Sequence, residues 1–263
     1  MFGPGGDIRI IGHRGARGVA PENTVPAIRH GVDVGVQAIE IDLHASKDEK
    51  IVVIHDPTLE RTTDGTGPVA ERTLDELRNF DAGYRFTPDE GTTFPFRGRG
   101  VSIPTLEEAM EAMGDLPAIL EVKSAAAGRL LAEWLPGRPE FDRIIVGGFN
   151  ADEVGPAGTA ARWRGAYQTD LYDFVLWGKL GVRRPLPDDL TAAMVPVRKG
   201  PVRIVTRGFV RRMHEQGKGV FVWTVNRPEE MRQLFDMGVD GLISDYPAVL
   251  RRVVEERLAA GRE

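Results

Sequence analysis

Short apolar segments alternate with helical patterns along the whole of this 263-residue chain. Each apolar segment has the length of a strand, and each is followed by a stretch in which apolar residues recur with helical periodicity. Such alternation implies parallel strand pairing, because every crossover has to carry the chain back across the sheet. The predicted strands are residues 8–11, 38–43, 118–123, 143–146, 165–169, 192–197, 220–225 and 241–244. The predicted helices are residues 25–34, 107–113, 127–134, 152–162, 171–180, 206–216, 228–235 and 248–258.

Eight such units in about 250 residues are what a closed barrel requires, so the sequence predicts an α/β fold, a (β/α)8 TIM barrel. An open, doubly wound sheet is the competing architecture. The alternation of strands and helices is interrupted after the second strand. An extra short strand is predicted at 51–55, and it leads into an insertion at about 56–103 that is rich in Gly, Pro, Thr and Arg. Insertions at a strand end usually build the rim of a site. We therefore expect a single barrel domain over residues 1–263, capped by this insertion.

The composition excludes several functions. The chain is 41% hydrophobic and 28% charged, which is typical of globular proteins, and its formal net charge is −5. A negative chain without a basic patch is not expected to bind nucleic acid. The absence of cysteine excludes disulfides, thiolate metal sites and thiol nucleophiles. No secretory signal and no apolar run of about 20 residues is visible, so we expect a cytoplasmic protein without stable membrane insertion. The sequence leaves the oligomeric state undetermined.

Acidic residues gather near the ends of the predicted strands, where active sites of (β/α)8 barrels lie. His13 follows the first strand, Glu40 and Asp42 lie late in the second, and Glu121 and Lys123 end the third. Side chains i and i+2 of a strand share one face, so Glu40 and Asp42 project together. Two carboxylates side by side are costly to bury unless a cation lies between them. The sequence therefore predicts a metal site at this end of the barrel.

The chemistry of this set indicates phosphodiester cleavage. Three carboxylates form an all-oxygen ligand set that suits a hard cation, Mg²⁺ or Ca²⁺, whereas zinc would more often recruit histidine. Arg14 and Lys123, together with such a cation, form a positive pocket for a phosphate. His13 and His55 can then exchange protons near neutral pH. One of them removes a proton from the attacking oxygen, and the other protonates the leaving alkoxide.

Several motifs occur together along nearly the whole chain. They are His13-Arg14-Gly15, Pro21-Glu22-Asn23-Thr24, Glu40-Ile41-Asp42, Val53-Ile54-His55-Asp56, Arg61-Thr62-Thr63, Leu120-Glu121-Val122-Lys123, Trp223-Thr224-Val225-Asn226 and Asp240-Gly241-Leu242-Ile243-Ser244-Asp245-Tyr246-Pro247. This combination resembles the glycerophosphodiester phosphodiesterase family. Residues from about 125 to 215 carry little recognisable signal.

The resemblance implies a (β/α)8 barrel that hydrolyses glycerophosphodiesters to sn-glycerol 3-phosphate and an alcohol. It implies that His13 and His55 are the acid/base pair and that Glu40, Asp42 and Glu121 bind the metal. By the same likeness, Arg14 and Lys123 hold the phosphate, and Trp223 lines the glycerol side. In that family the neighbouring glycerol hydroxyl is thought to attack phosphorus first. The sequence is equally compatible with direct attack by water, and with either histidine as the acid.

Two other functions compete with this interpretation. A lysophospholipase D-type enzyme would cleave lysophospholipids on the same barrel, and would need an apolar channel. A binding barrel without turnover would be expected to lack a ligand or a histidine, and every expected group is present. Other polar residues near the motifs have structural interpretations: Glu22 and Asn23 as a helix cap and loop brace, Asp245 as a tie for the last loop, and His44 as a hydrogen-bonded rim residue or a support for the site.

Overall fold

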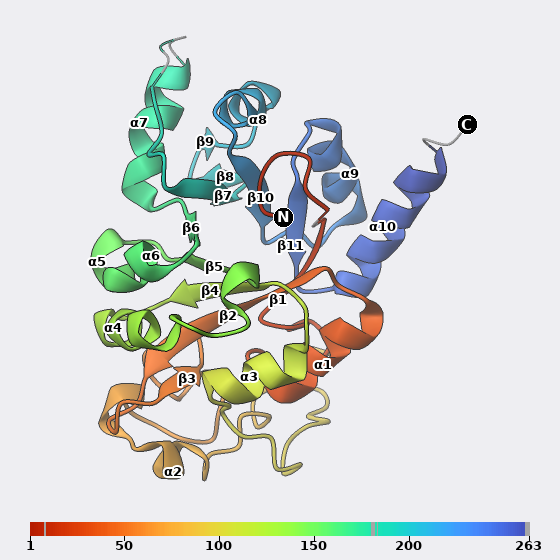
Figure 1. Cartoon of the computed structure of the whole chain (residues 1–263). Coiled ribbons are helices and arrows are strands. Elements are labelled where there is room, and N and C mark those ends of the chain that lie inside the picture. Colours follow the sequence, from red (N-terminus) through yellow and green to blue (C-terminus); the bar gives the residue numbers. More distant parts are fainter. Residues whose placement is uncertain (8, 180–181, 183, 261–263) are drawn as a thin grey trace.

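The structure is a computed structural model that describes residues 1–7, 9–179, 182 and 184–260. Within these residues the main sheet runs in the order β1-β11-β10-β7-β6-β5-β4-β2, and β1 also pairs with β2 (Figure 1). This last pairing closes a barrel of eight parallel strands, so the predicted (β/α)8 fold is confirmed. The barrel strands are β1 (Ile10–His13), β2 (Ala38–Ala45), β4 (Ala118–Val122), β5 (Ile144–Gly147), β6 (Trp163–Gly165), β7 (Leu190–Pro196), β10 (Gly219–Trp223) and β11 (Gly241–Ser244).

Helices follow the barrel strands and cover the outside of the barrel (Figure 1). They are α1 (Val25–Val34), α3 (Leu106–Met113), α4 (Ala125–Trp134), α5 (Ala151–Val154), α6 (Pro156–Ala160), α7 (Gln168–Lys179), α8 (Arg207–His214), α9 (Pro228–Asp236) and α10 (Pro247–Ala260). Smaller elements are β3 (Ile51–Val53), η1 (Val69–Glu71), α2 (Leu74–Leu77), η2 (Phe141–Arg143), β8 (Arg198–Lys199) and β9 (Val202–Arg203). Thr24 caps α1 by accepting the N–H of Ala27, as expected for a hydroxyl at that position.

Three details of the prediction differ from the structure. The fifth strand is β6 at Trp163–Gly165 and not residues 165–169, because the carboxylate of Asp170 accepts the N–H of Tyr167 and helix α7 begins at Gln168. The predicted helix 152–162 is two short helices, separated at Gly155, which has a φ of 50°. Residues 198–203 form a small hairpin, β8–β9, that the sequence did not indicate. The first residue of the predicted strand 8–11 and the last of the predicted helix 171–180 lie outside the described residues.

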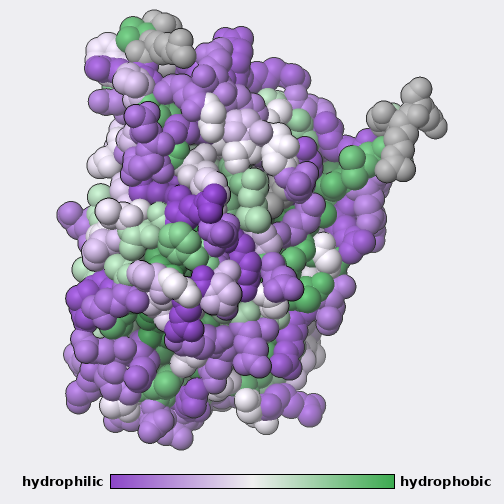
Figure 2. Space-filling model, in the orientation of Figure 1, coloured by the Kyte–Doolittle hydropathy of each residue, from purple (hydrophilic) through white to green (hydrophobic). Residues whose placement is uncertain are grey.

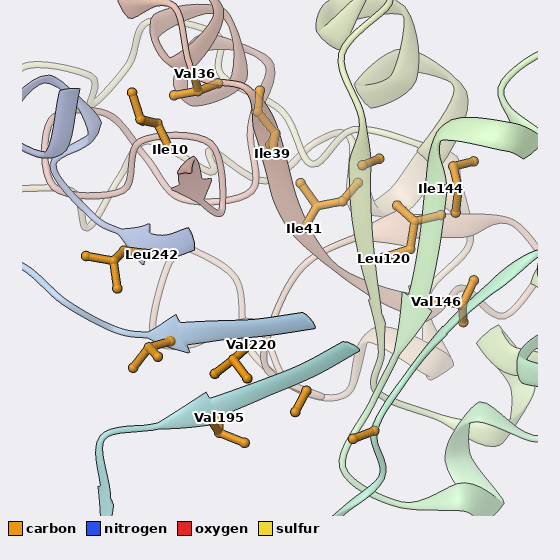
Figure 3. Close-up of a cluster of buried hydrophobic side chains, with 14 of the residues drawn as sticks. Ile10, Val36, Ile39, Ile41, Leu120, Ile144, Val146, Val195, Val220 and Leu242 are labelled. Carbon is orange, nitrogen blue, oxygen red and sulfur yellow. The ribbon is translucent and has the colours of Figure 1, made fainter. Parts of the chain in front are cut away.

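Successive side chains of strand β2 alternate between the hydrophobic core and the candidate site. Ile39, Ile41 and Leu43 point outward into the layer between strands and helices, where they belong to the largest buried hydrophobic cluster. Figure 3 shows side chains of this cluster projecting from successive barrel strands. The alternate residues Glu40 and Asp42 then point into the barrel, because successive side chains of a strand face opposite sides. One residue alternation therefore supplies both the core and the acidic pair.

A second cluster fills the interior of the barrel. It contains Phe2, Ile11, Ala38, Ile119, Ile145, Ala192, Phe221 and Ile243. Phe2 comes from the N-terminal segment and packs edge-on against Phe221, with ring centroids 6.1 Å apart. Gly219 allows this approach, because a Cβ there would lie 2.1 Å from the carbonyl oxygen of Phe2. These interior residues leave only the carboxyl end of the barrel for polar side chains.

The insertion after β2 packs around a cluster of its own. After β3, which pairs antiparallel with β2, residues 54–105 run through η1 and α2 at the lower end of the view in Figure 1. The buried cluster of this region contains Val52, Ile54, Leu59, Val69, Leu77, Ala82, Val101 and Ile103. Its aromatic residues pack on one another, as with Phe86 and Phe96, whose ring centroids lie 5.4 Å apart. That this insertion caps the site stays a prediction.

The outer face drawn in Figure 2 is largely hydrophilic, and hydrophobic residues form smaller groups on it. None of the helices in the described part of the chain combines the length and the apolar character needed to cross a bilayer.

Candidate active site

The register of three neighbouring strands brings the predicted site residues together. His13 of β1 lies opposite Glu40 of β2, and Asp42 lies opposite Glu121 of β4. Lys123 follows two residues after Glu121 on the same side. Because neighbours in a parallel sheet point the same way, these side chains share the carboxyl end of the barrel interior. The site predicted from strand parity is therefore assembled in the structure.

The loop after β1 positions Arg14 above this cluster. Gly15 has a φ of 86°, and a Cβ on it would lie 2.5 Å from the backbone of Ala27, so this turn requires glycine. The tight turn directs the backbone N–H of Arg14 to Oε2 of Glu40 at 2.9 Å. The Arg14 guanidinium then donates to Glu22 at 2.6 Å, and its Nε lies 3.1 Å from Oδ2 of Asp42.

The three carboxylates form a compact, buried acidic cluster. Glu40, Asp42 and Glu121 each offer one oxygen, and these atoms all lie within 4.8 Å of one another. Oε1 of Glu40 is buried and has no hydrogen-bond partner within the described residues, and Oδ1 of Asp42 is buried with the ammonium of Lys123 3.1 Å away. Burial, reinforced by the charges of Asp42 and Glu121, raises the pKa of Glu40 well above its ordinary value. A buried carboxylate oxygen without a hydrogen-bond partner, such as Oε1 of Glu40, is what a hard divalent cation would satisfy in an all-oxygen set.

Positive charges partly balance this cluster. The Lys123 ammonium donates to Glu121 at 2.6 Å and lies 3.1 Å from Oδ1 of Asp42. Burial opposes the ionisation of Asp42, but Lys123 and Arg14 outweigh it, so the pKa of Asp42 lies below its ordinary value. Asn23 adds a hydrogen bond of 2.8 Å to Oδ2 of Asp42. Asn23 thus braces a proposed ligand directly, beyond the loop-brace role suggested by the sequence.

His13 is held by a carboxylate that directly follows the last strand, β11. Its Nδ1 lies 2.6 Å from Oδ1 of Asp245, and its Nε2 lies 3.9 Å from Oε2 of Glu40. Burial alone would raise the pKa of Asp245, but the hydrogen bond and charge of His13 outweigh it and lower that pKa. An ionised carboxylate can only accept, so we assign the proton of the neutral ring to Nδ1. Asn226 completes the support by donating to Oδ2 of Asp245 at 2.8 Å.

His55 is held in the same way by its sequence neighbour. Its Nδ1 lies 2.6 Å from Oδ1 of Asp56. Arg61 of the insertion donates to both oxygens of Asp56, at 2.5 and 3.2 Å, and to both oxygens of Glu22, at 2.8 and 2.7 Å. Nε2 of His44 donates to the carbonyl oxygen of His55 at 3.1 Å, which fixes the backbone at that position. Burial lowers the pKa of His55 below its ordinary value.

A cavity of 660 Å³ opens onto both histidines, both cations and two of the three carboxylates, and Asp42 does not line it. The residues predicted from the sequence that line it are His13, Arg14, Glu40, His55, Glu121, Lys123 and Trp223. Sequence reasoning missed the opposite wall, which α7, the β8–β9 hairpin and Phe149 supply. None of residues 56–103 lines this cavity, and the insertion reaches the site through Arg61. Phe149 lies four residues after Ile145, an interior residue of β5, so the parity argument applied to the end of β5 would have indicated it.

Residues 13–249 match the profile of the glycerophosphoryl diester phosphodiesterase family. The chain belongs to this family. Among relatives of this phosphodiesterase, the glycerophosphodiester phosphodiesterase of Caldanaerobacter subterraneus is 30% identical over 269 residues, which cover 94% of this chain and 98% of that protein. A lysophospholipase D of Mus musculus is 25% identical over 272 residues, which cover 92% of this chain and 85% of that protein.

Solved structures share the fold of this phosphodiesterase. The glycerophosphoryl diester phosphodiesterase domain of a Mycobacterium tuberculosis protein matches with a TM-score of 0.83 at 24% identity, over 94% of this chain and 99% of that one. A phosphodiesterase of Oleispira antarctica, in complex with the product sn-glycerol-3-phosphate, matches with a TM-score of 0.73 at 25% identity, over 94% of this chain and 96% of that one. The family resemblance inferred from the motifs is confirmed.

Proposed function

We propose that this phosphodiesterase hydrolyses glycerophosphodiesters, such as glycerophosphocholine, to sn-glycerol 3-phosphate and an alcohol, with the help of one divalent cation, Mg²⁺ or Ca²⁺. The observation that carries the proposal is the convergence on one cavity of two histidines, each held at Nδ1 by a carboxylate, with a cluster of three carboxylates. The Caldanaerobacter relative and the product-bound Oleispira structure support the substrate class.

Glu40, Asp42 and Glu121 would hold the cation. When bound, a divalent cation supplies positive charge that stabilises the charge developing on the phosphate oxygens. The formal charges support this fit. The three carboxylates carry more charge than the two cations Arg14 and Lys123 can balance, because Arg14 also pairs with Glu22.

The two histidines supply the proton transfers. With Nδ1–H donated to Asp245, Nε2 of His13 is free to take or give a proton, and Asp56 prepares His55 in the same way. One imidazole removes the proton of the attacking oxygen, and the other gives a proton to the leaving alkoxide. The leaving alcohol departs with the proton of the second imidazole, and the first imidazole carries the proton of the attacking oxygen. Exchange of one proton with water then restores the starting state of the pair. Whether water or the neighbouring glycerol hydroxyl attacks, one imidazole has to accept a proton and the other has to donate one.

Arg14, Lys123 and Trp223 would bind the rest of the substrate. Glu22 and Asp42 fix the guanidinium of Arg14, and the carboxylate cluster fixes the ammonium of Lys123, so both charges are preorganised for phosphate. Trp223 lines the cavity and packs edge-on against Phe149, with ring centroids 5.8 Å apart. Its exposed ring face would cover the glycerol carbons.

The test is turnover of glycerophosphocholine with Mg²⁺ or Ca²⁺, followed as released sn-glycerol 3-phosphate. His13→Ala and His55→Ala should each lower kcat by about 10²–10⁴-fold, the usual size of acid–base contributions. His30→Ala is the matched control, because His30 is an exposed residue of α1. Wild-type rates in both active-site variants, with folding confirmed by thermal unfolding, would contradict the proposal.

Lysophospholipid cleavage is the second candidate function. The observation that favours it is the apolar wall that lies across the cavity from the carboxylates. The mouse lysophospholipase D among the relatives is in keeping with it.

A further inference from the structure

Arg17 is a cation of the cavity wall to which the proposed chemistry gives no task. It lies in the loop after β1, and the loop after β11 fixes its place. The backbone N–H of Gly18 donates to the carbonyl oxygen of Asp245 at 3.0 Å. Gly18 also lies directly under the ring of Tyr246, because a Cβ on it would be 2.4 Å from that ring. These two contacts place the side chain of Arg17 beside the carboxylate of Asp245.

The Arg17 guanidinium lies between two carboxylates of the site. Its Nε is 3.6 Å from Oε2 of Glu22 and 3.8 Å from Oδ1 of Asp245. Each of these two oxygens also holds another functional group. Oδ1 of Asp245 lies 2.6 Å from Nδ1 of His13, and Oε2 of Glu22 accepts a hydrogen bond of 2.8 Å from Arg61. Arg17 therefore faces the oxygen atoms on which the supports of both histidines depend.

Side chains of alternating charge thus connect the two imidazoles. In order, the network contains His13, Asp245, Arg17, Glu22, Arg61, Asp56 and His55. Arg17 closes it, because no other arginine or lysine nitrogen in the described part of the chain lies within 4 Å of the Asp245 carboxylate. Without Arg17, the partly buried carboxylates of Glu22 and Asp245 would repel each other across the gap that it occupies.

We propose that Arg17 is a positioning residue for His13: its charge holds Asp245 against the imidazole and, through Glu22, joins this support to that of His55. The inference rests on the proposed function, since it assumes that His13 transfers a proton. Arg17 lies on the Nδ1 side of the ring, whereas Nε2 faces Glu40 at 3.9 Å. Arg17 therefore acts through Asp245 and leaves the phosphate to Arg14 and Lys123.

The kinetics of Arg17 variants with glycerophosphocholine and Mg²⁺ or Ca²⁺ test this role. Arg17→Met removes the charge and should lower kcat by about tenfold, because an imidazole that loses its fixed position reacts more slowly. KM should change by less than about twofold, because Arg17 does not contact the phosphate. Arg17→Lys should restore kcat to within about threefold, because ion pairs longer than a hydrogen bond depend mainly on charge. Arg257→Met is the matched control, because Arg257 is 40% exposed and pairs with Asp236 away from the cavity.

The outcomes separate the inference from the proposed function. A wild-type kcat in Arg17→Met would overturn the positioning role. So would a raised KM at unchanged kcat, which would indicate that Arg17 binds the substrate itself, or a loss in Arg17→Lys as large as that in Arg17→Met. Absence of turnover in the unmodified protein would overturn the proposed function.

A spectroscopic measurement tests the same contact without turnover. The Nδ1 proton of His13, assigned by its loss in His13→Gln, should give a downfield proton NMR signal because it is donated to Asp245. In Arg17→Met this signal should move upfield and exchange faster with water, whereas in Arg257→Met it should stay in place. Folding of each variant is confirmed by thermal unfolding. An unchanged signal in folded Arg17→Met would overturn the inference, whatever the activity of the enzyme.

Discussion

Arg61 is expected to position the second histidine without touching the substrate. Its guanidinium bridges Asp56, which holds Nδ1 of His55, and Glu22, which holds Arg14. Replacing it by methionine keeps the length of the side chain and removes every one of these bonds. Asp56 then loses the partner that keeps its carboxylate in place, and the ring of His55 gains freedom to rotate.

Arg61→Met should have a small effect on stability and a larger effect on kcat. Arg61 is 42% exposed, so its ion pairs are screened by water and Arg61→Met should lower the free energy of unfolding by only about 1–2 kcal/mol. For a domain of this size that shift corresponds to about 2–8 °C in Tm. The effect on kcat should be larger, about 10- to 100-fold, because small errors in the position of a catalytic group are costly.

A double-mutant cycle separates positioning from general destabilisation. If Arg61 acts through Asp56, the double variant Arg61→Met, Asp56→Asn should have nearly the kcat of Asp56→Asn alone. Arg78→Met is the control, because Arg78 is 43% exposed, lies in the same insertion and pairs with Glu108 away from the site. It should change kcat little. A wild-type kcat in Arg61→Met, or losses that multiply in the double variant, would refute this account of the insertion.

Two further predictions concern the charges of the site. Because burial raises the pKa of Glu40, cation binding should release protons, and more of them as the pH is lowered from neutrality. Calorimetric titration with Mg²⁺ or Ca²⁺ checks this, because proton release makes the measured enthalpy depend on the ionisation enthalpy of the buffer. The same enthalpy in two buffers of different ionisation enthalpy would contradict the prediction. Glu121→Gln should weaken cation binding. Burial would raise the pKa of Glu22, but hydrogen bonds from Arg61 and the charge of Arg14 lower it from 4.5 to about 2, so Glu22 contributes up to about 3 kcal/mol of stability above pH 4.5. Glu22→Gln should therefore lower the free energy of unfolding near pH 7, and this loss of stability should shrink as the pH falls from 4.5 toward 2. A loss of stability that does not depend on pH would contradict this. Glu108→Gln is the control and should lower the free energy of unfolding by less than about 1 kcal/mol at every pH.

The acidic half of the site could be predicted because it depends on strand parity alone. Glu40 and Asp42 alternate with Ile39 and Ile41, and a slip of one residue would bury the carboxylates under the helices. That alternation is readable in one short stretch of sequence. The barrel then brings Glu121 beside Asp42 through the register of β2 and β4.

The role of Asp245 could be predicted only in part. The sequence indicates a tie for the last loop, and the hydrogen bond from Asn226 and that from the N–H of Gly18 to its carbonyl oxygen fit this. Its hydrogen bond to His13 spans 232 positions of sequence and depends on the closure of the barrel between β11 and β1. An argument that followed the closed order of the strands would have placed the end of the eighth strand beside the first.

The apolar wall of the cavity could not be predicted because its residues follow the weakest patterns in the chain. Strand β6 has only three residues, and the boundary between it and α7 depends on a hydrogen bond from the backbone of Tyr167 to Asp170. Moving that boundary by a few residues rotates α7 and changes which of its side chains face the cavity. The β8–β9 hairpin has two residues in each strand, too few for any alternation to be visible.

The two walls of the cavity differ in how well they tolerate substitution. The proposed chemistry draws on loops and strands before Ser124, together with Asp245, and its carboxylates and histidines are held by hydrogen bonds with neighbouring residues. The opposite wall draws on Phe149, α7 and the β8–β9 hairpin, whose exposed side chains have few such partners. Substitution of an exposed apolar residue generally changes stability by less than about 0.5 kcal/mol. The apolar wall can therefore be extended, shortened or made polar with little effect on folding, whereas the same changes around Glu40 would leave buried charges without partners.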